Sequence, residues 1–216
     1  MTRIYVAEIG FLRDRQRLAE KWHLLSAERQ EDVLSHRMEE DCSRSAGAGL
    51  LLEYGLREQG FTLLAGVDGK RRVTLAKGPH GKPYLTETEE LQFNLSHAGD
   101  YAAAVFSSDA VGIDIERIRE AKQRLAQRCF TKEEYEFLEQ AKKEEKDRVF
   151  TGLWTRKESY IKAVGKGMSL PLRDFSVLDG TLPFATWNEP TGYCLSVCAE
   201  LMPEEKPVWV DLEKSI

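Results

Sequence analysis

The sequence predicts an α+β fold with antiparallel sheet, and three observations support that prediction. Apolar runs at residues 93–95 and 101–106 flank a turn at residues 96–100, which is the pattern of a β-hairpin. Helical stretches and strand-like runs alternate without the regular β-α-β order that is typical of a parallel sheet. The chain has 216 residues, enough to bury a core as one domain or as two small ones.

The N-terminal half should open with a strand at residues 3–9. The charged stretch at residues 13–34 predicts a helix with one interruption, where Ser26 is a suitable N-cap. Residues 41–56 are rich in small residues and leucine, which predicts a helix packed closely on a neighbouring element. Two short apolar runs and a glycine- and proline-rich loop precede the hairpin, at residues 61–64, 73–76 and 77–84.

The C-terminal half should begin with a strand at residues 111–116. Thr131 and Glu134 have the spacing of a capping box, which predicts a helix start. A longer helix is predicted at about residues 149–164, ended by Gly165. Three later runs are strand-like, at residues 175–178, 193–199 and 208–212. We place the boundary between halves near residue 108, giving segments 1–108 and 109–216.

Composition narrows the class of protein. The formal net charge is -5, which argues against non-specific nucleic-acid binding. No apolar run is long enough to span a bilayer, and no signal peptide is visible, so we expect a cytoplasmic protein. The four cysteines form no C-x-x-C pair, and Cys194 and Cys198 share one face of an apolar strand. We therefore expect buried free thiols and no zinc site.

The strand at residues 111–116 has alternating character. Its apolar residues should face a core, which leaves Gly112, Asp114 and Glu116 on the other face. Two carboxylates about 7 Å apart along a strand can meet on one divalent cation. Oxygen ligands of this kind suit magnesium, which also binds substrate phosphates. Taken alone, the pattern is more typical of a half-buried strand with a solvated acidic face.

The helix at residues 149–164 has charged residues where its apolar stripe should be continuous. Lys157 lies in the middle of the stripe, which is unfavourable unless the ammonium has a partner or reaches solvent. Glu158 and Lys162 lie on its rim, one turn apart, where a surface ion pair is the simpler interpretation. Together the three charges suggest the rim of a pocket. Possible phosphate contacts elsewhere, each weak alone, are Arg44, Lys82, Ser96 and His97.

These segments together resemble the surfactin-type 4'-phosphopantetheinyl transferases, in the order and spacing of that family, over residues 77–175. The matching strings are Gly81-Lys82-Pro83, Phe93-Asn94-Leu95-Ser96-His97, Gly112-Ile113-Asp114-Ile115-Glu116, Phe130-Thr131-x-x-Glu134 and Trp154-x-x-Lys157-Glu158-x-x-x-Lys162-Ala163-x-Gly165-Lys166-Gly167. The resemblance implies two similar α+β halves related by a pseudo-twofold axis, with coenzyme A in the cleft between them. One chain would then form the whole cleft, so we expect a monomer.

The resemblance also implies an activity and its residues. The 4'-phosphopantetheine arm of coenzyme A would pass to a serine of an apo-acyl or peptidyl carrier protein, releasing 3',5'-ADP. Asp114, Glu116 and Glu158 match the family's magnesium ligands. Glu158 is also the candidate general base, directly or through water, and Lys157 and Lys162 would offset phosphate charge. Coenzyme A would be bound by Arg44, Lys82, Ser96 and His97, and by Asp114, Lys157 and Lys162.

Two features depart from the family or go beyond it. The family often has two basic residues on the early helix, whereas here Arg29 matches the first position and Asp32 takes the second. The segment after the Asp114 strand is locally basic, and either docks an acidic carrier or forms a solvated face. Its basic residues are Arg117, Arg119, Lys122, Arg124 and Arg128.

Two other functions also fit parts of the pattern. A D-x-E pair with a distant E-x-x-x-K could form a magnesium-dependent nuclease site, although such an enzyme should have a basic stripe. A non-catalytic carrier-binding module on the same fold is the other alternative. The intact set of Asp114, Glu116, Glu158 and Lys162 argues against it, because a module without activity has no need of all four.

Overall fold

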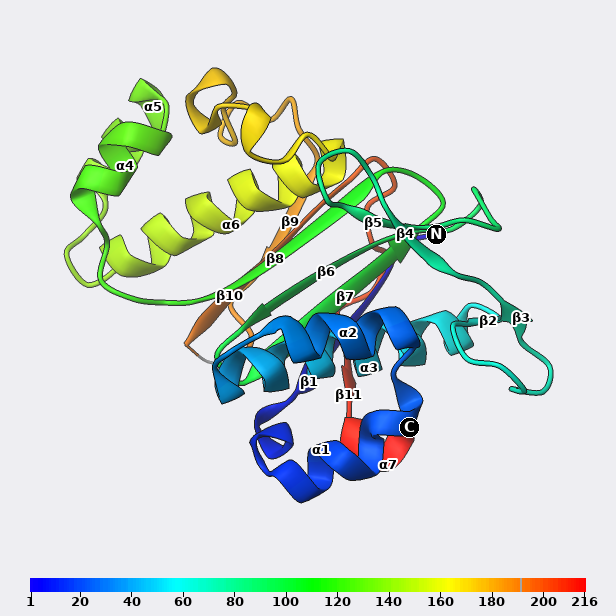
Figure 1. Ribbon diagram of the computed structural model, residues 1–216. Helices are drawn as coiled ribbons and strands as arrows, with labels where there is room; N and C mark the ends of the chain where they lie inside the picture. Colours follow the sequence, from blue (N-terminus) through cyan, green and yellow to red (C-terminus); the bar gives the residue numbers. More distant parts are fainter. Residues whose placement is uncertain (191) are drawn as a thin grey trace.

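The computed structural model describes residues 1–190 and 192–216, and it confirms a mixed α+β fold with antiparallel sheets (Figure 1). One sheet has the strand order β11-β1-β7-β6, with β1 paired antiparallel to β7 and parallel to β11. Its strands are β1 (Arg3–Glu8), β6 (Gln92–Ala98), β7 (Tyr101–Ser107) and β11 (Val208–Val210). Because β11 pairs with β1, the end of segment 109–216 lies in the sheet of the N-terminal half.

The second sheet is antiparallel and has the order β8-β10-β9. Its strands are β8 (Val111–Arg117), β9 (Phe184–Trp187) and β10 (Tyr193–Ala199). Two short pairs complete the sheets, β2 (Phe61–Thr62) with β3 (Arg71–Arg72) and β4 (Leu75–Lys77) with β5 (Pro83–Leu85).

Helices cover the outer faces of the two sheets. The α-helices are α1 (Arg15–Lys21), α2 (Ala27–Ser35), α3 (Glu39–Glu58), α4 (Gln123–Cys129), α5 (Lys132–Gln140), α6 (Lys146–Val164) and α7 (Leu212–Ser215). Short 3-10 turns lie at η1 (Gly10–Arg13), η2 (Trp22–Leu24), η3 (Gly167–Ser169) and η4 (Leu172–Asp174). Among the described helices, none is long and apolar enough to cross a membrane.

Local capping signals set several helix ends as predicted. The Ser26 hydroxyl accepts a hydrogen bond from the Arg29 backbone N–H at the start of α2. The capping box of Thr131 and Glu134 is complete at the start of α5. Gly165 ends α6 in the left-handed conformation, with φ +72°. Each of these signals acts within one turn of helix, which is why the sequence alone could predict it.

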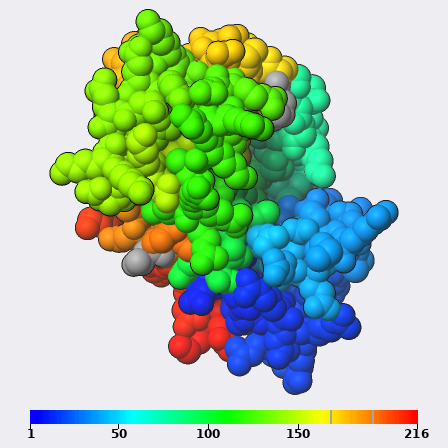
Figure 2. All heavy atoms as spheres, turned by 90° about the vertical axis from the view of Figure 1, so that its left-hand side faces the viewer, coloured from blue at the N-terminus to red at the C-terminus, as the bar shows by residue number. Residues whose placement is uncertain are grey.

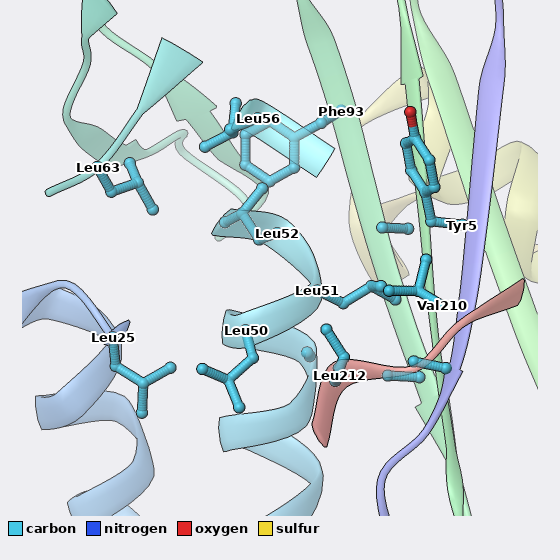
Figure 3. Packing of buried hydrophobic residues seen from close by; sticks show 14 of the residues in the cluster. Tyr5, Leu25, Leu50, Leu51, Leu52, Leu56, Leu63, Phe93, Val210 and Leu212 are labelled. Atoms are coloured by element: carbon cyan, nitrogen blue, oxygen red, sulfur yellow. The ribbon is translucent and has the colours of Figure 1, made fainter. Parts of the chain in front are cut away.

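Helix α3 and the first sheet enclose the core of the N-terminal half (Figure 3). Leu50, Leu51, Leu52 and Leu56 of α3 are all inaccessible to solvent. Figure 3 shows Leu50 facing Leu25, which lies between η2 and α2, while Leu51 faces the sheet. This packing fixes α2 and α3 against the sheet, and both helices line the pocket described below.

The opposite face of the first sheet packs on the second sheet. Ile4 and Val6 of β1 belong to one apolar cluster with Ile113 of β8 and Val197 of β10. Helix α6 covers the other face of the second sheet, which gives a layered order of α3, first sheet, second sheet and α6 (Figure 1). The pseudo-twofold relation of the halves stays a prediction.

Two strand predictions need correction. Strand β6 continues through Ser96 and His97 to Ala98, so these residues lie in the strand and the turn is shortened to Gly99 and Asp100. The register, with His97 opposite Ala102, is set by pairing with β7. Gly99 has φ +55°, and a Cβ there would lie 2.3 Å from the Tyr193 hydroxyl, so glycine is required.

Residues 175–178 do not form the predicted strand. Their backbone groups are satisfied by side chains instead, since Val177 N–H donates to Glu134 and Phe175 C=O accepts from Lys157. The third strand of this sheet is β9, further along the chain. Cys194 and Cys198 are buried free thiols on β10, as predicted.

Candidate active site

A pocket of about 550 Å³ lies where α2, α3, β6, β8 and α6 come together. Its lining residues are Arg29, Asp32, His36, Ser45, Ala48, Pro83, Asn94, Leu95, Ser96, His97, Asp114, Glu116, Trp154, Glu158 and Lys162. The strand alternation explains one wall, because Ile113 and Ile115 enter the core and turn Asp114 and Glu116 to the opposite face. The sequence-predicted carboxylates therefore meet in one pocket with Lys162, Ser96 and His97.

The close approach of α6 to β8 brings Glu158 and Lys162 beside Asp114. A Cβ built on Gly112 would lie 2.0 Å from the Ser159 carbonyl oxygen and 2.4 Å from the Ala163 nitrogen. Only glycine leaves room for the helix backbone at this distance.

Asp114 is the most enclosed acid of the pocket, with a side chain 6% exposed. Its Oδ1 accepts hydrogen bonds from Lys162 Nζ at 2.6 Å and from the Ser96 hydroxyl at 3.0 Å. Its Oδ2 is buried and has no hydrogen-bond partner among the described residues. A buried carboxylate oxygen without a donor is costly, so this atom points to a cationic ligand of the pocket.

The three carboxylates disfavour one another's charged form. Burial raises the pKa of Glu116 to about 6, and the neighbouring charge of Asp114 adds to the effect. The pKa of Glu158 is raised by burial and by Asp114. Burial also raises the pKa of Asp114, against the stabilising charge of Lys162. A divalent cation would relieve this repulsion.

Side chains of β6 join the two sheets at this pocket. The side-chain oxygen Oδ1 of Asn94 accepts a hydrogen bond from the Ile113 backbone N–H at 2.9 Å. The Ser96 hydroxyl accepts one from the Ile115 backbone N–H at 3.2 Å. Lys162 Nζ also lies 3.2 Å from the Ser96 oxygen. Ser96 thus links the junction of β6 and β8 to the side chains of Asp114 and Lys162.

Two family models match consecutive parts of this chain. The family model of the 4'-phosphopantetheinyl transferase superfamily matches residues 110–204, and the model "4'-phosphopantetheinyl transferase, N-terminal" matches residues 14–110. The chain is 34% identical over 189 residues to the 4'-phosphopantetheinyl transferase ffp of Bacillus subtilis, covering 81% of this chain and 82% of that protein. It is 32% identical over 189 residues, with the same coverage, to the 4'-phosphopantetheinyl transferase Sfp of Bacillus subtilis strain 168.

This protein belongs to the 4'-phosphopantetheinyl transferase superfamily. A solved structure of Helicobacter pylori holo-[acyl-carrier-protein] synthase in complex with coenzyme A aligns with 50% of this chain and 98% of its own, at 19% identity and a TM-score of 0.35. That alignment is too weak to support an inference about the site.

One predicted residue of the transferase does not lie on the pocket rim. Lys157 is completely buried, and its Nζ contacts Glu134 Oε2 at 2.8 Å. The same ammonium donates to the carbonyl oxygens of Leu172 and Phe175 at 2.7 and 2.8 Å. It also lies 4.4 Å from the ring centroid of Phe175. The prediction of a rim position is wrong, because the partner that the sequence required is an interior glutamate.

Two other predicted phosphate contacts lie outside the pocket lining. Lys82 Nζ donates to the carbonyl oxygens of Val111 and Ala163, at 3.0 and 3.2 Å, and burial lowers its pKa to about 8. Arg44 pairs with Glu40 and Asp41 on its own helix. The charge of Arg44 still reaches the pocket. Partial desolvation of the imidazole, in a residue that is exposed overall, and the charge of Arg44 lower the pKa of His97.

The structure adds pocket residues that the sequence analysis did not select. They are Arg29, Asp32, His36, Ser45, Asn94 and Trp154. The first two are three residues apart on α2, so they share one face of that helix. That spacing was available in the sequence, but the contact of α2 with α3, which turns this face to the pocket, was not.

Proposed function

We propose that this transferase moves the 4'-phosphopantetheine arm of coenzyme A onto a serine of an apo-acyl or peptidyl carrier protein. The observation that supports the proposal most strongly is the buried, unpartnered Oδ2 of Asp114 beside Glu116, Glu158 and Lys162 in an open pocket. A pocket built this way suits a diphosphate bound together with a cation. Membership in the superfamily gives the reaction class.

The donor set fits magnesium. Within residues 1–190 and 192–216, no group of three or more His, Cys, Asp or Glu side chains is placed to hold a metal ion. Magnesium commonly binds one or two carboxylates and takes its other ligands from water and phosphate oxygens, so a protein-only cage is not needed. Asp114 and Glu116 would hold the ion from β8, and Glu158 would reach it after its side chain turns toward them; the ion would supply positive charge to the diphosphate.

The remaining chemistry falls to side chains of this pocket. In the proposed reaction the serine oxygen bonds to the β-phosphorus, the bond from that phosphorus to the bridging oxygen breaks, and 3',5'-ADP leaves with the electron pair. Glu158 accepts the serine proton, directly or through water. Lys162, fixed by Asp114 and Ser96, offsets charge on the phosphate oxygens.

The carrier could dock on the basic segment after β8. A second pocket of about 250 Å³ shares Glu116 and Trp154 with the first, and Arg117, Arg119 and Lys122 line it. Figure 2 shows the green residues of this part of the chain rising on the face beside the light-blue residues of the N-terminal half. A basic surface next to the reacting site would attract an acidic carrier.

Docking on this surface can be tested by charge reversal. The triple variant R119E/K122E/R124E should raise the KM for carrier several-fold and leave the KM for coenzyme A unchanged. The variant K132E/K142E/K143E, which reverses three exposed lysines outside both pockets, is the matched control. An unchanged carrier KM would assign the segment to the solvated surface instead.

The carrier mass tests the proposed function. The protein is incubated with apo-carrier, coenzyme A and magnesium, and the product is examined by mass spectrometry. We expect the gain of one phosphopantetheine arm, abolished by EDTA and by Asp114→Ala. Carrier binding without a mass gain would favour the non-catalytic module, and cleavage of added nucleic acid would favour the nuclease.

A further inference from the structure

An acidic side chain lies among the cations at the α2 end of the main pocket. Asp32 Oδ2 accepts a hydrogen bond from the Ser45 hydroxyl at 2.8 Å and lies 3.4 Å from a terminal guanidinium nitrogen of Arg29. Its Oδ1 lies 3.8 Å from Lys77 Nζ. The Asp32 side chain is 32% exposed, so it faces the pocket and is not part of the core.

Asp32 keeps its negative charge at neutral pH. Burial alone would raise its pKa, but the Ser45 hydrogen bond and the charges of Arg29 and Lys77 outweigh burial and hold the pKa below its ordinary value. One terminal nitrogen of Arg29 donates to the Ser45 carbonyl oxygen at 2.7 Å and to the Ser45 hydroxyl at 3.3 Å, while its buried Nε has no partner among the described residues. Asp32 therefore offsets part of the positive charge that Arg29 and Lys77 bring to this end.

The two ends of the pocket thus differ in what they can bind. Helices α2 and α3 form one end, α6 and β8 form the other, and the order of layers in Figure 1 separates them. His97 lies between the ends, since it follows Ser96 on β6, the strand that contacts both α3 and β8. The proposed carrier surface adjoins the pocket at Glu116 and Trp154, so the serine enters from that side, and in-line attack on a diphosphate at the Asp114 end directs the leaving nucleotide the opposite way, toward Asp32. A 3'-phosphate dianion there would meet a carboxylate, whereas a ribose 3'-hydroxyl could donate to it.

We propose that Asp32 determines the donor specificity of this transferase. Because of Asp32, the enzyme would tolerate loss of the 3'-phosphate and use 3'-dephospho-coenzyme A about as efficiently as coenzyme A. The inference rests on the proposed function. The reaction is balanced in the same way for both donors. The serine oxygen displaces the nucleotide from the β-phosphorus, and the leaving group is 5'-AMP in place of 3',5'-ADP.

The test compares kcat/KM for the two donors with one apo-carrier. In the wild type, we expect the two values to agree within about threefold. Asp32→Asn keeps the shape of the side chain, removes its charge and frees Arg29 and Lys77 for the phosphate. It should raise the preference for coenzyme A by about 5- to 10-fold. A change of this size is expected when the repulsion between one carboxylate and the 3'-phosphate is removed in a solvent-filled pocket. Glu31→Gln, which removes an exposed carboxylate from the same helix outside the pocket, should leave the preference unchanged.

A binding measurement separates this inference from the proposed function. Calorimetry with 3',5'-ADP and 5'-AMP reports on the 3'-phosphate without any transfer, and it applies to the wild type even if Asp32→Asn fails to fold. Absence of carrier modification with both donors would overturn the proposed function and this inference together. Transfer with a preference for coenzyme A above about threefold in the wild type, or equal effects of Asp32→Asn and Glu31→Gln, would overturn the role of Asp32 alone. Similar affinities for 3',5'-ADP and 5'-AMP in the wild type would support it.

Discussion

The buried ion pair of Lys157 and Glu134 makes a sharp prediction about stability. Both side chains are fully inaccessible to solvent, and their charged atoms lie 2.8 Å apart. The pair joins α6 to α5, and Lys157 also bonds to the carbonyl oxygens of Leu172 and Phe175. We therefore predict that Lys157→Met, which keeps the length of the side chain and removes its charge, destabilises the fold.

The magnitude follows from what the substitution leaves behind. Glu134 would keep its bonds to the Thr131 and Val177 backbone N–H groups but would lose its only cationic partner among the described residues. Removing one partner of a buried pair typically costs about 3–5 kcal/mol of unfolding free energy. For a chain of this size, that corresponds to a fall in Tm of about 10 °C.

A double-mutant cycle in urea measures the pair directly. Lys157→Met, Glu134→Gln and the double variant should show a coupling energy of about 2 kcal/mol, because the second change removes the acid that the first leaves unpaired. A loss of unfolding free energy below about 1 kcal/mol in Lys157→Met, or additive losses in the double variant, would show that the ion pair does not stabilise the fold. An unchanged unfolding free energy with a large rise in the KM for coenzyme A would instead indicate that Lys157 contacts coenzyme A.

Three further predictions concern the seam between β8, β6 and α6. Gly112→Ala should lower the unfolding free energy by about 2–3 kcal/mol and abolish transfer, because its Cβ would meet the Ser159 carbonyl oxygen. An unchanged unfolding free energy in chemical denaturation would contradict the close packing of α6 on β8. Ser96→Ala should cost about 1–3 kcal/mol in the same assay, since it leaves the buried Ile115 N–H without its acceptor, and a cost no larger than that of an exposed serine would show that the bond is unimportant. The pKa of Lys82 is about 8 in the folded protein, below its ordinary value of 10.5. Between these two pH values the unfolded chain binds more protons than the folded protein, so the free energy of unfolding should rise with pH. We expect a rise of about 1 kcal/mol from pH 8 to 9.5. Urea midpoints measured in wild type and Lys82→Met should differ in their pH dependence, and parallel curves would count against this assignment.

The sequence was sufficient for features decided within a few residues. The caps at Ser26 and Thr131 and the stop at Gly165 depend on local geometry, so their residue types identify them. The alternation around Asp114 was equally local, and it correctly placed the apolar residues of β8 in a core. Whether the acidic face bordered a pocket or open solvent depended on α6, which packs there only because Gly112 has no side chain.

The errors involve contacts between distant parts of the chain. Ser96 and His97 lie in a strand because pairing with β7 extends the hairpin, and no local signal fixes that register. The apolar stripe of α6 indicated that Lys157 needed a partner, but its identity as Glu134 depended on how α5 packs. Asp32 was noted as a departure from the family, yet its contacts with Ser45 and Lys77 arise only in the folded chain.

We propose that Asp114, Glu116 and Glu158 bind one divalent cation together with the diphosphate of coenzyme A. Electron paramagnetic resonance with Mn²⁺ as a probe measures this binding without the reaction. We predict one site in the presence of coenzyme A, weakened at least about tenfold by Asp114→Asn and by Glu158→Gln, and unaffected by Glu31→Gln. Equal Mn²⁺ affinity in the wild type and in both pocket variants would contradict the account.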